Sequence, residues 1–290
     1  MFREKDFDNA YQLIEHLSPL KQSVWGRGRY IFRGQPCSSF GLAPAALRTV
    51  GPMAATSVMP SNLIGSERQV LFEVQVLRAF IKACDAAGIQ IPGDSEILRD
   101  KIQSLIWELG SEEDWPPKVG YPVLATAQHH GVPTCLLDWT RRSYVACYFA
   151  ASAVLHTPAK SGRLAIWAFN TEKLSDWGPV EFLEMPGATS ANLAAQDGVF
   201  TVSTLKATMG GGLESTTVER LLEYDEHQDD PEPLLWKLTL PASEAAALLA
   251  LCADFGVKGS TLFPGYEGVA REIRDKAFAG ELGRTFPLRN

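Results

Sequence analysis

Short apolar runs with irregular spacing constrain the fold of this chain more than any other feature. Runs of strand length occur at 29–32, 134–137, 164–169, 180–183, 199–203 and 234–240. Helical patterns lie near 8–17, 141–155, 242–255 and 268–279. Because helices and loops separate the strands irregularly, the sequence predicts an α+β fold with a mixed, largely antiparallel sheet and packed helices, not a regular βαβ array.

A long helical stretch interrupts this pattern. Apolar residues recur at helical spacing from Val70 to Cys84 and again from Ile97 to Leu109. A chain of 290 residues can bury one large core. We therefore expect a single domain over 1–290 with a helical insertion at about 62–110. The stretch 50–61 has no periodicity and predicts a mobile loop that tolerates shortening.

Charge and composition indicate which kinds of partner the protein binds and in which cellular compartment it occurs. The net charge of −7 and the pI near 5.3 oppose broad attachment to a nucleic acid backbone, although a local basic pocket is compatible with them. The charged N-terminus and the lack of an 18-residue apolar run predict a cytoplasmic protein without a membrane partner. Five scattered cysteines, none in a C-x-x-C pair, predict reduced thiols and no thiolate zinc site.

The run Phe32-Arg33-Gly34 is the first candidate for chemistry. It ends a β-prone segment with a glycine, so Arg33 is presented at a strand end, where pockets often form. The planar guanidinium suits a phosphate or a carboxylate ligand. The alternative is a structural arginine paired with a carboxylate of the fold.

The segment from Gln128 to Arg141 is the second candidate. It indicates a helix end, a turn at Gly131, a short strand and then a helix that Asp138 or Thr140 would cap. Adjacent histidines on a helix point about 100° apart, so His129 and His130 do not form a metal site and a metal-free protein is expected. Trp139 suits either the core or a stacking surface.

Two later segments are weaker candidates. Gln196 lies at a turn before a strand, where a capping role is the simple alternative to function. Glu267 precedes a predicted helix, where a carboxylate favours the helix dipole. We also expect Arg33 and Asp138 to meet at the floor of one cleft, because both end β-prone runs that would lie at the same sheet edge.

The combination of these motifs resembles the FRG family, named for the run at Phe32, Arg33 and Gly34. The stretch from Gln128 through Pro133 to Thr140 looks like the central motif of the family, and the segments around Gln196 and Phe263 look like its later motifs. The resemblance spans about residues 10 to 276. Cys135 departs from the pattern, since arginine is common there in the family. Members of the family occur in bacteria and phages, and the resemblance implies a role in defence, including phage defence, or as a toxin or a regulator.

The resemblance also implies an ADP-ribosyltransferase-like fold and an enzyme that uses NAD. Expulsion of nicotinamide requires a cation for the phosphates, a stacking surface and a group that binds the ribose hydroxyl. The expected catalytic residues are Arg33, Asp138, Gln196 and Glu267. The expected NAD contacts are Arg33, Gln128, His130, Trp139, Thr140, Arg141 and Tyr144. The second hypothesis is a binding module without catalysis, in which Arg33, Asp138 and Arg141 form a buried network and an exposed face recognises a protein or a nucleotide-like molecule.

Overall fold

The computed structural model describes most of the chain. The described residues are 2–26, 28–48, 54, 59, 65–107, 114–157, 162–173, 180–186, 191–203, 205–206, 217–221 and 233–281. Of the predicted loop at 50–61, Ala54 and Met59 alone fall within this part. Ala54 is buried and Met59 packs near Phe72, and the rest of the loop lies outside the described residues.

A seven-stranded mixed sheet forms the centre of the protein. Its strand order is β1-β9-β5-β2-β4-β7-β6, in which β1 is parallel to β9 and every other neighbouring pair is antiparallel. The strands are β1 (Arg3–Asp6), β2 (Tyr30–Gln35), β4 (Leu136–Thr140), β5 (Arg163–Asn170), β6 (Glu181–Leu183), β7 (Gly198–Val202) and β9 (Leu235–Pro241). A separate pair joins β3 (Asp114–Trp115) to β8 (Leu205–Lys206). The predicted α+β class with a mixed, largely antiparallel sheet is confirmed.

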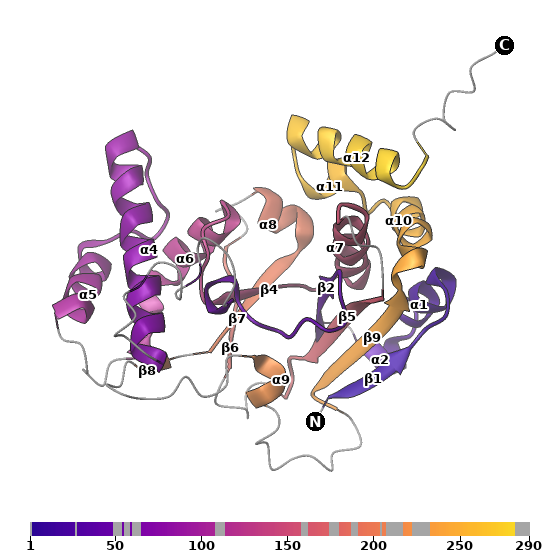
Figure 1. Ribbon diagram of the computed structural model, residues 1–290, viewed down its shortest axis with the longest axis horizontal. Coiled ribbons are helices and arrows are strands. Elements are labelled where there is room, and N and C mark those ends of the chain that lie inside the picture. Colours follow the sequence, from indigo (N-terminus) through magenta and orange to yellow (C-terminus); the bar gives the residue numbers. More distant parts are fainter. Residues whose placement is uncertain are drawn as a thin grey trace.

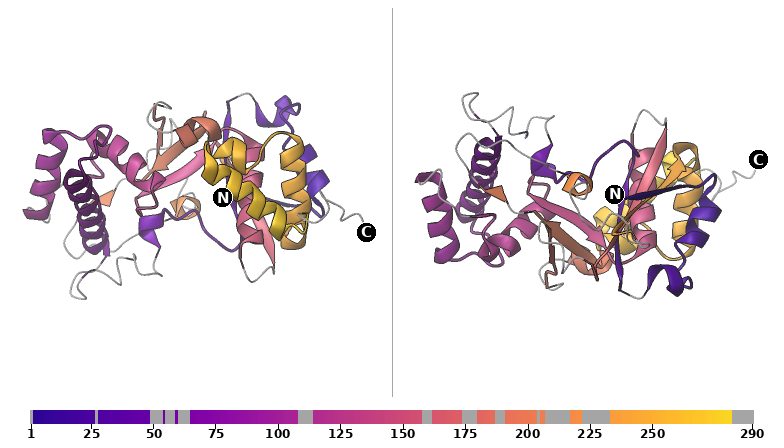
Figure 2. Two further views of the ribbon diagram at one scale, coloured as in Figure 1. Left: turned by 90° about the horizontal axis from the view of Figure 1, so that it is seen from above. Right: turned by 90° about the horizontal axis from the view of Figure 1, so that it is seen from below.

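The helices form two groups at opposite ends of the long axis (Figures 1 and 2). One group comprises α1 (Ala10–His16), α2 (Gln22–Trp25), α7 (Ser143–Leu155), α10 (Ala245–Asp254), α11 (Gly259–Leu262) and α12 (Tyr266–Phe278). The other comprises α4 (Gly65–Ala87), α5 (Glu96–Trp107) and α6 (Tyr121–His129). The short helix α8 (Ala191–Gln196) lies between the two groups in Figure 1, and α9 (Val218–Leu221) lies on the other side of the sheet.

Period-two alternation explains how the sheet buries both faces. In β5, Leu164, Ile166 and Ala168 face the cluster of α1, α7 and α10, whereas Trp167 and Phe169 face a separate core on the opposite side. The predicted insertion contributes to a further cluster, in which α4, α5 and α6 pack against apolar residues of β4, β6 and β7. The two helical groups thus cover different parts of the sheet.

The sheet is split between β2 and β4. These strands pair at one position, Phe32 opposite Thr140, whereas β2 pairs with β5 along all six of its residues. Beyond Phe32, β2 passes under α7, and Gly34 makes this possible. A Cβ on Gly34 would lie 1.9 Å from the backbone oxygen of Ala146. The glycine therefore permits close approach of a helix to a strand.

Candidate functional site

Arg33 bridges the split between β2 and β4. Its Nη1 donates a hydrogen bond of 2.7 Å to the backbone carbonyl of Asp138, in place of the ladder bond that the diverging strands do not make. The same nitrogen lies 3.6 Å from Oδ2 of Asp138. The side chain of Arg33 is 15% exposed. Burial, with repulsion from Arg48, lowers the pKa of Arg33, although Asp138 opposes this shift.

Asp138 holds an exposed carboxylate in a fixed position. Its side chain is 59% exposed, and its Oδ1 accepts a hydrogen bond of 2.5 Å from Nε2 of Gln128. The amide of Gln128 is itself oriented, because its Oε1 accepts from the hydroxyl of Thr134. Asp138 lies within β4 and does not cap a helix, and the N-cap of α7 is Arg142. The prediction that Asp138 or Thr140 caps this helix is wrong.

A cleft lies over Asp138, between α7 and α12 on one side and α6 and α8 on the other. It consists of a cavity of about 330 Å³ and a smaller one of about 70 Å³, and Asp138 and Gln196 line both. The larger cavity is lined further by Phe32, Arg33, Gly34, Trp139, Thr140, Ala146, Phe149, Ala153 and Arg271. The predicted residues Arg33, Asp138 and Gln196 therefore meet around one open space.

Hydrogen bonds connect the later motifs to the same cleft. The hydroxyl of Thr140 donates to the backbone carbonyl of Gln196 at 2.6 Å, which fixes the end of α8 to β4. The side-chain amide of Gln196 donates to the backbone carbonyl of Leu262 at 3.2 Å. Segments that are more than 200 residues apart in the sequence are thus joined in a chain of contacts from Arg33 to Leu262.

The wall formed by α7, α11 and α12 contains Arg271 and Phe149, which no motif in the sequence indicates. The guanidinium of Arg271 lies 4.4 Å from the ring centre of Phe263, and Phe149 meets Phe263 edge to face at 6.0 Å. Helical spacing could have placed Arg271 on one face of α12, but nothing in the sequence indicates that this face turns toward Arg33. The cleft therefore has two arginines and aromatic neighbours.

A buried polar cluster fixes α12 and hence Arg271. Asp275 is 3% exposed and accepts hydrogen bonds from Tyr148 at 2.6 Å and Ser152 at 2.8 Å, while His156 Nε2 lies 3.0 Å away. Burial and the neighbouring Asp275 raise the pKa of Tyr148. The phenol therefore stays protonated and continues to donate. Asp275 and Arg271 are one helical turn apart, so this anchor sets the position of the arginine.

Both arginines of the cleft have unsatisfied donors. The Nε of Arg33 and the Nε of Arg271 are buried and have no hydrogen-bond acceptor among the described residues. A buried donor without an acceptor costs about 1–3 kcal/mol, and an arginine fork suits planar or tetrahedral anions. The site is consequently suited to an anionic ligand that also contacts aromatic surface.

The histidines line the smaller cavity. His129 Nε2 lies 3.1 Å from the amide of Asn192, and its ring is 5.1 Å from that of His130 at an interplanar angle of 80°. Burial and His130 lower the pKa of His129, against the effect of Asp138. No group of three or more potential metal-ligating side chains occurs in the part of the chain that the structure describes.

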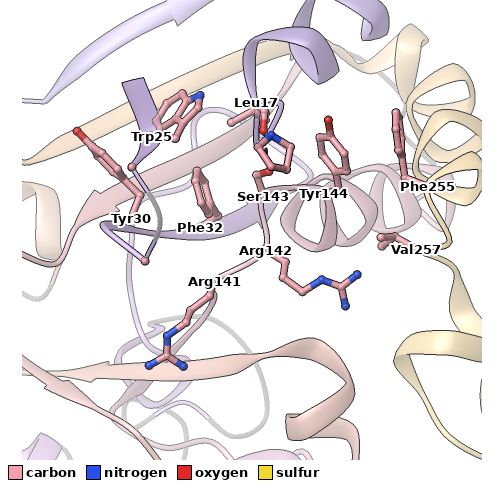
Figure 3. A pocket seen from close by; sticks show the side chains of 13 residues that line it. Leu17, Trp25, Tyr30, Phe32, Arg141, Arg142, Ser143, Tyr144, Phe255 and Val257 are labelled. Carbon is pink, nitrogen blue, oxygen red and sulfur yellow. Dashed lines mark hydrogen bonds between the residues drawn. The ribbon is translucent and has the colours of Figure 1, made fainter. Parts of the chain in front are cut away.

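Several predicted site residues lie elsewhere. Trp139 is 3% exposed, donates to Thr201 and packs on Phe169 in the core of the opposite sheet face, so its ring does not stack in the cleft. Glu267 is exposed in the first turn of α12 and lines neither cavity. Arg141 and Tyr144 line a different pocket at the N-terminus of α7 (Figure 3).

The fold and the site define an α+β protein with an arginine-lined cleft over a split sheet. The model of the FRG domain family matches residues 28–158, and the chain therefore contains an FRG domain. This confirms the family that the sequence motifs indicated. The matched span holds Arg33, Gln128 and Asp138, whereas Gln196, Phe263 and Arg271 lie beyond it. No curated protein and no solved structure matches the chain.

The described residues also bear on membrane association. None of the helices in the described ranges has the length and apolar character needed to cross a membrane.

Proposed function

We propose that the cleft over Asp138 binds NAD and supports ADP-ribosyltransferase-like chemistry. The observation that carries the proposal is the pairing of an exposed, oriented carboxylate with two buried arginine donors that lack acceptors among the described residues. A dinucleotide offers phosphates to Arg33 and Arg271 and a flat ring to Phe149. The cavity of about 330 Å³ suits part of such a ligand, with the remainder lying in the open mouth.

The reaction breaks the bond between nicotinamide and the ribose. Nicotinamide leaves with the bonding electron pair and becomes neutral, and positive charge develops on the ribose ring. An acceptor oxygen, from water or from a target molecule, then bonds to the anomeric carbon and loses its proton. With water the products are ADP-ribose, nicotinamide and a proton.

We assign to Asp138 the role of assisting this step. A fixed carboxylate stabilises an oxocarbenium-like state electrostatically and accepts the hydrogen bond of a ribose hydroxyl. Gln128 holds the carboxylate in place with its bond of 2.5 Å, so little reorganisation is required during reaction. Gln196 adds an amide on the other side of the cleft. Glu267, exposed on α12, has no role in this scheme.

The test is release of nicotinamide from NAD by the purified protein. We expect wild-type protein to release it, and Asp138→Asn to lower the rate at least about 100-fold, since electrostatic stabilisers typically contribute that much. Asp197→Asn is the matched control, because Asp197 is a similarly exposed carboxylate that pairs with Arg141 outside the cleft. Glu267→Gln should also keep the wild-type rate. Equal rates in Asp138→Asn and the controls contradict the assignment.

A binding module without catalysis is the second candidate. The bond from Arg33 to the backbone carbonyl of Asp138 favours it, since part of the arginine's capacity is used to hold the sheet. In that case NAD or a related nucleotide binds and no nicotinamide appears. A defence or toxin role in bacteria would fit the enzymatic proposal, because consumption of NAD or modification of a target both harm a host cell.

A further inference from the structure

A second pocket lies at the N-terminus of α7, and we call it the α7 pocket. It has a volume of about 480 Å³, larger than the cleft over Asp138. Its lining consists of Leu17, Pro19, Trp25, Gly26, Gly28, Tyr30, Phe32, Arg141, Arg142, Ser143, Tyr144, Phe255 and Val257. Asp138, Gln196 and Arg271 do not line it, and Phe32 is the residue that contributes to both spaces.

Aromatic rings form two of its walls. Trp25 packs edge to face against Tyr30 at 5.2 Å and against Phe32 at 5.6 Å. On the other wall, Tyr144 packs against Phe255 at 4.9 Å. Figure 3 shows these two sets on either side of the pocket, with the guanidinium groups of Arg141 and Arg142 on a third side. Walls of this kind favour a flat, apolar ring.

Two polar side-chain groups of the lining already donate hydrogen bonds to main-chain carbonyls of the protein. Trp25 Nε1 donates to the carbonyl of His16 at 2.6 Å, and the hydroxyl of Ser143 donates to the carbonyl of Leu17 at 2.9 Å. A ring with many polar substituents, such as a purine, would find few partners for them. The interior therefore selects a plain aromatic ring over a nucleobase.

The charge at the mouth favours an anion. The described lining residues include two arginines and no carboxylate. Arg141 is neutralised by Glu184 and by Asp197 at 3.5 Å. Arg142 is exposed, has no carboxylate within ion-pair distance in the described ranges, and makes one long bond of 3.3 Å to the carbonyl of Ala195. Arg142 is thus the cation available to a ligand.

We infer that the α7 pocket is a second ligand site, which takes a small molecule composed of one plain aromatic group and one anionic group. The ring enters between the walls of Trp25 and Tyr144, and the carboxylate, sulfonate or phosphate meets Arg142. The adjoining N-terminus of α7 adds a favourable dipole to this charge but does not define the site.

The experiment compares two fluorescent probes of the same shape on the full chain. Anilinonaphthalene sulfonate carries the anion, and phenylnaphthylamine lacks it. We expect Arg142→Gln to weaken sulfonate binding about 3- to 10-fold and to change binding of the neutral probe less than about 2-fold. Phe255→Ala should weaken binding of both probes, because it removes one of the two rings in the wall formed by Tyr144 and Phe255. Phe255 is 56% exposed, so this variant is expected to fold normally.

Arg274→Gln is the matched control, since Arg274 is exposed on α12 and lines neither space. The inference is overturned if Arg142→Gln leaves the affinity for both probes unchanged. It is also overturned if Arg271→Gln, a change in the cleft, lowers their affinity instead. A saturating amount of ADP-ribose should not displace the sulfonate, and displacement would show that the pocket is part of the cleft site. If ADP-ribose does not bind at all, the proposed function fails, while the probe titrations still decide the α7 pocket.

Discussion

Arg33 serves the sheet and the cleft with different atoms. Nη1 holds the backbone of β4 through the carbonyl of Asp138, while the buried Nε has no acceptor among the described residues. The carboxylate of Asp138 is too exposed to be a buried partner, at 59%. The picture of a sealed ion pair, one of the two alternatives drawn from the sequence, therefore does not hold. The interaction that stabilises the fold is the bond to the main chain.

A double-mutant cycle tests this distinction. Arg33→Ala should lower the free energy of unfolding by roughly 1.5–3 kcal/mol, since a charge-assisted hydrogen bond is lost. Asp138→Ala should cost less than about 1 kcal/mol, as expected for an exposed ion pair. Because alanine keeps the carbonyl that Arg33 binds, the double variant should equal the sum of the two within about 0.5 kcal/mol. Urea denaturation measures all three, and a coupling energy above about 1 kcal/mol would show that the carboxylate is the partner that matters.

Glu73 is a second residue whose burial has a measurable effect. It is 2% exposed in α4 and accepts hydrogen bonds of 2.7 Å from Gln69 and from Trp115. Burial raises its pKa, and the hydrogen bonds from Gln69, Trp115 and Cys135 oppose the rise only in part. Burial and Glu73 together also raise the pKa of Cys135, so this thiol stays protonated.

The raised pKa of Glu73 makes stability depend on pH. The contribution of Glu73 to the free energy of unfolding is fully present below about pH 4.3, the ordinary glutamate pKa. It is lost as the pH rises through the higher pKa that Glu73 has in the folded protein. Glu73→Gln should remove this dependence. The measurement is the free energy of unfolding of both proteins at several pH values from about 4 to 8. Parallel pH profiles for wild type and Glu73→Gln would contradict the prediction.

At the scale of elements, the contact of β2 with α7 determines where the cleft forms. The sequence suggested that Gly34 releases the backbone at the end of a strand. In the structure Gly34 lies inside β2 and pairs with Ile166 of β5. Because it has no side chain, α7 can lie against the strand. The sequence shows the glycine, but α7 begins more than 100 residues after it. Only the tertiary fold brings the glycine and the helix together.

Gly34→Ala should separate these two elements. The new Cβ would lie 1.9 Å from the backbone oxygen of Ala146 and 2.8 Å from the nitrogen of Ala150, so α7 must move. We expect a loss of about 3 kcal/mol in unfolding free energy, as for an overpacked core. Gly120→Ala is the control, because the nearest atom to its Cβ is the flexible end of Leu98 at 3.1 Å. A melting temperature of Gly34→Ala equal to that of the control would contradict the close contact.

The placement of strands shows what could be read from the sequence. β5 and β9 were predicted nearly at their observed bounds, because apolar runs and burial coincide there. β1 was missed, since its residues Arg3–Asp6 are all exposed and show no alternation. Arg33 and Asp138 do come together, but not because two strands end at the same edge of the sheet. β2 and β4 are antiparallel, and the residues meet because pairing stops at Phe32 and Thr140.

At the scale of the whole molecule, the residues that line the cleft come from several strands and helices. Arg33, Asp138 and Gln196 belong to motifs that are visible in the sequence. Arg271 and Phe149 are not, because a helix face shows its periodicity but not the element that it faces. The sequence is compatible with Trp139 in the core or in the cleft. Trp139 and Asp138 are neighbours in β4 and therefore point to opposite faces of the sheet, so Trp139 lies in the core.

His16 should make the whole fold sensitive to acid. It is half-buried between Phe7 and Trp25. Burial, with the charges of Lys5 and Lys21, lowers the pKa of His16 to about 4. The unfolded chain binds this proton near pH 6.5, so stability is present above that value and is lost as the pH falls toward 4. His16→Phe should reduce the loss between about pH 7 and 4.5 by about 1 kcal/mol, after allowance for solvent screening. Denaturation at both pH values measures it, and an unchanged loss would contradict it.

The most direct test of the cleft is a calorimetric titration of ADP-ribose into wild type, Arg271→Gln and Arg274→Gln. ADP-ribose carries the phosphates but cannot release nicotinamide, so binding is measured apart from catalysis. We predict one site in wild type, about 10-fold or greater weakening in Arg271→Gln through loss of a charge-assisted bond, and no change in Arg274→Gln. Binding should also raise the melting temperature of the proteins that bind. Absence of binding by wild type, or equal affinity in Arg271→Gln, would contradict the assignment of this cleft as a nucleotide site.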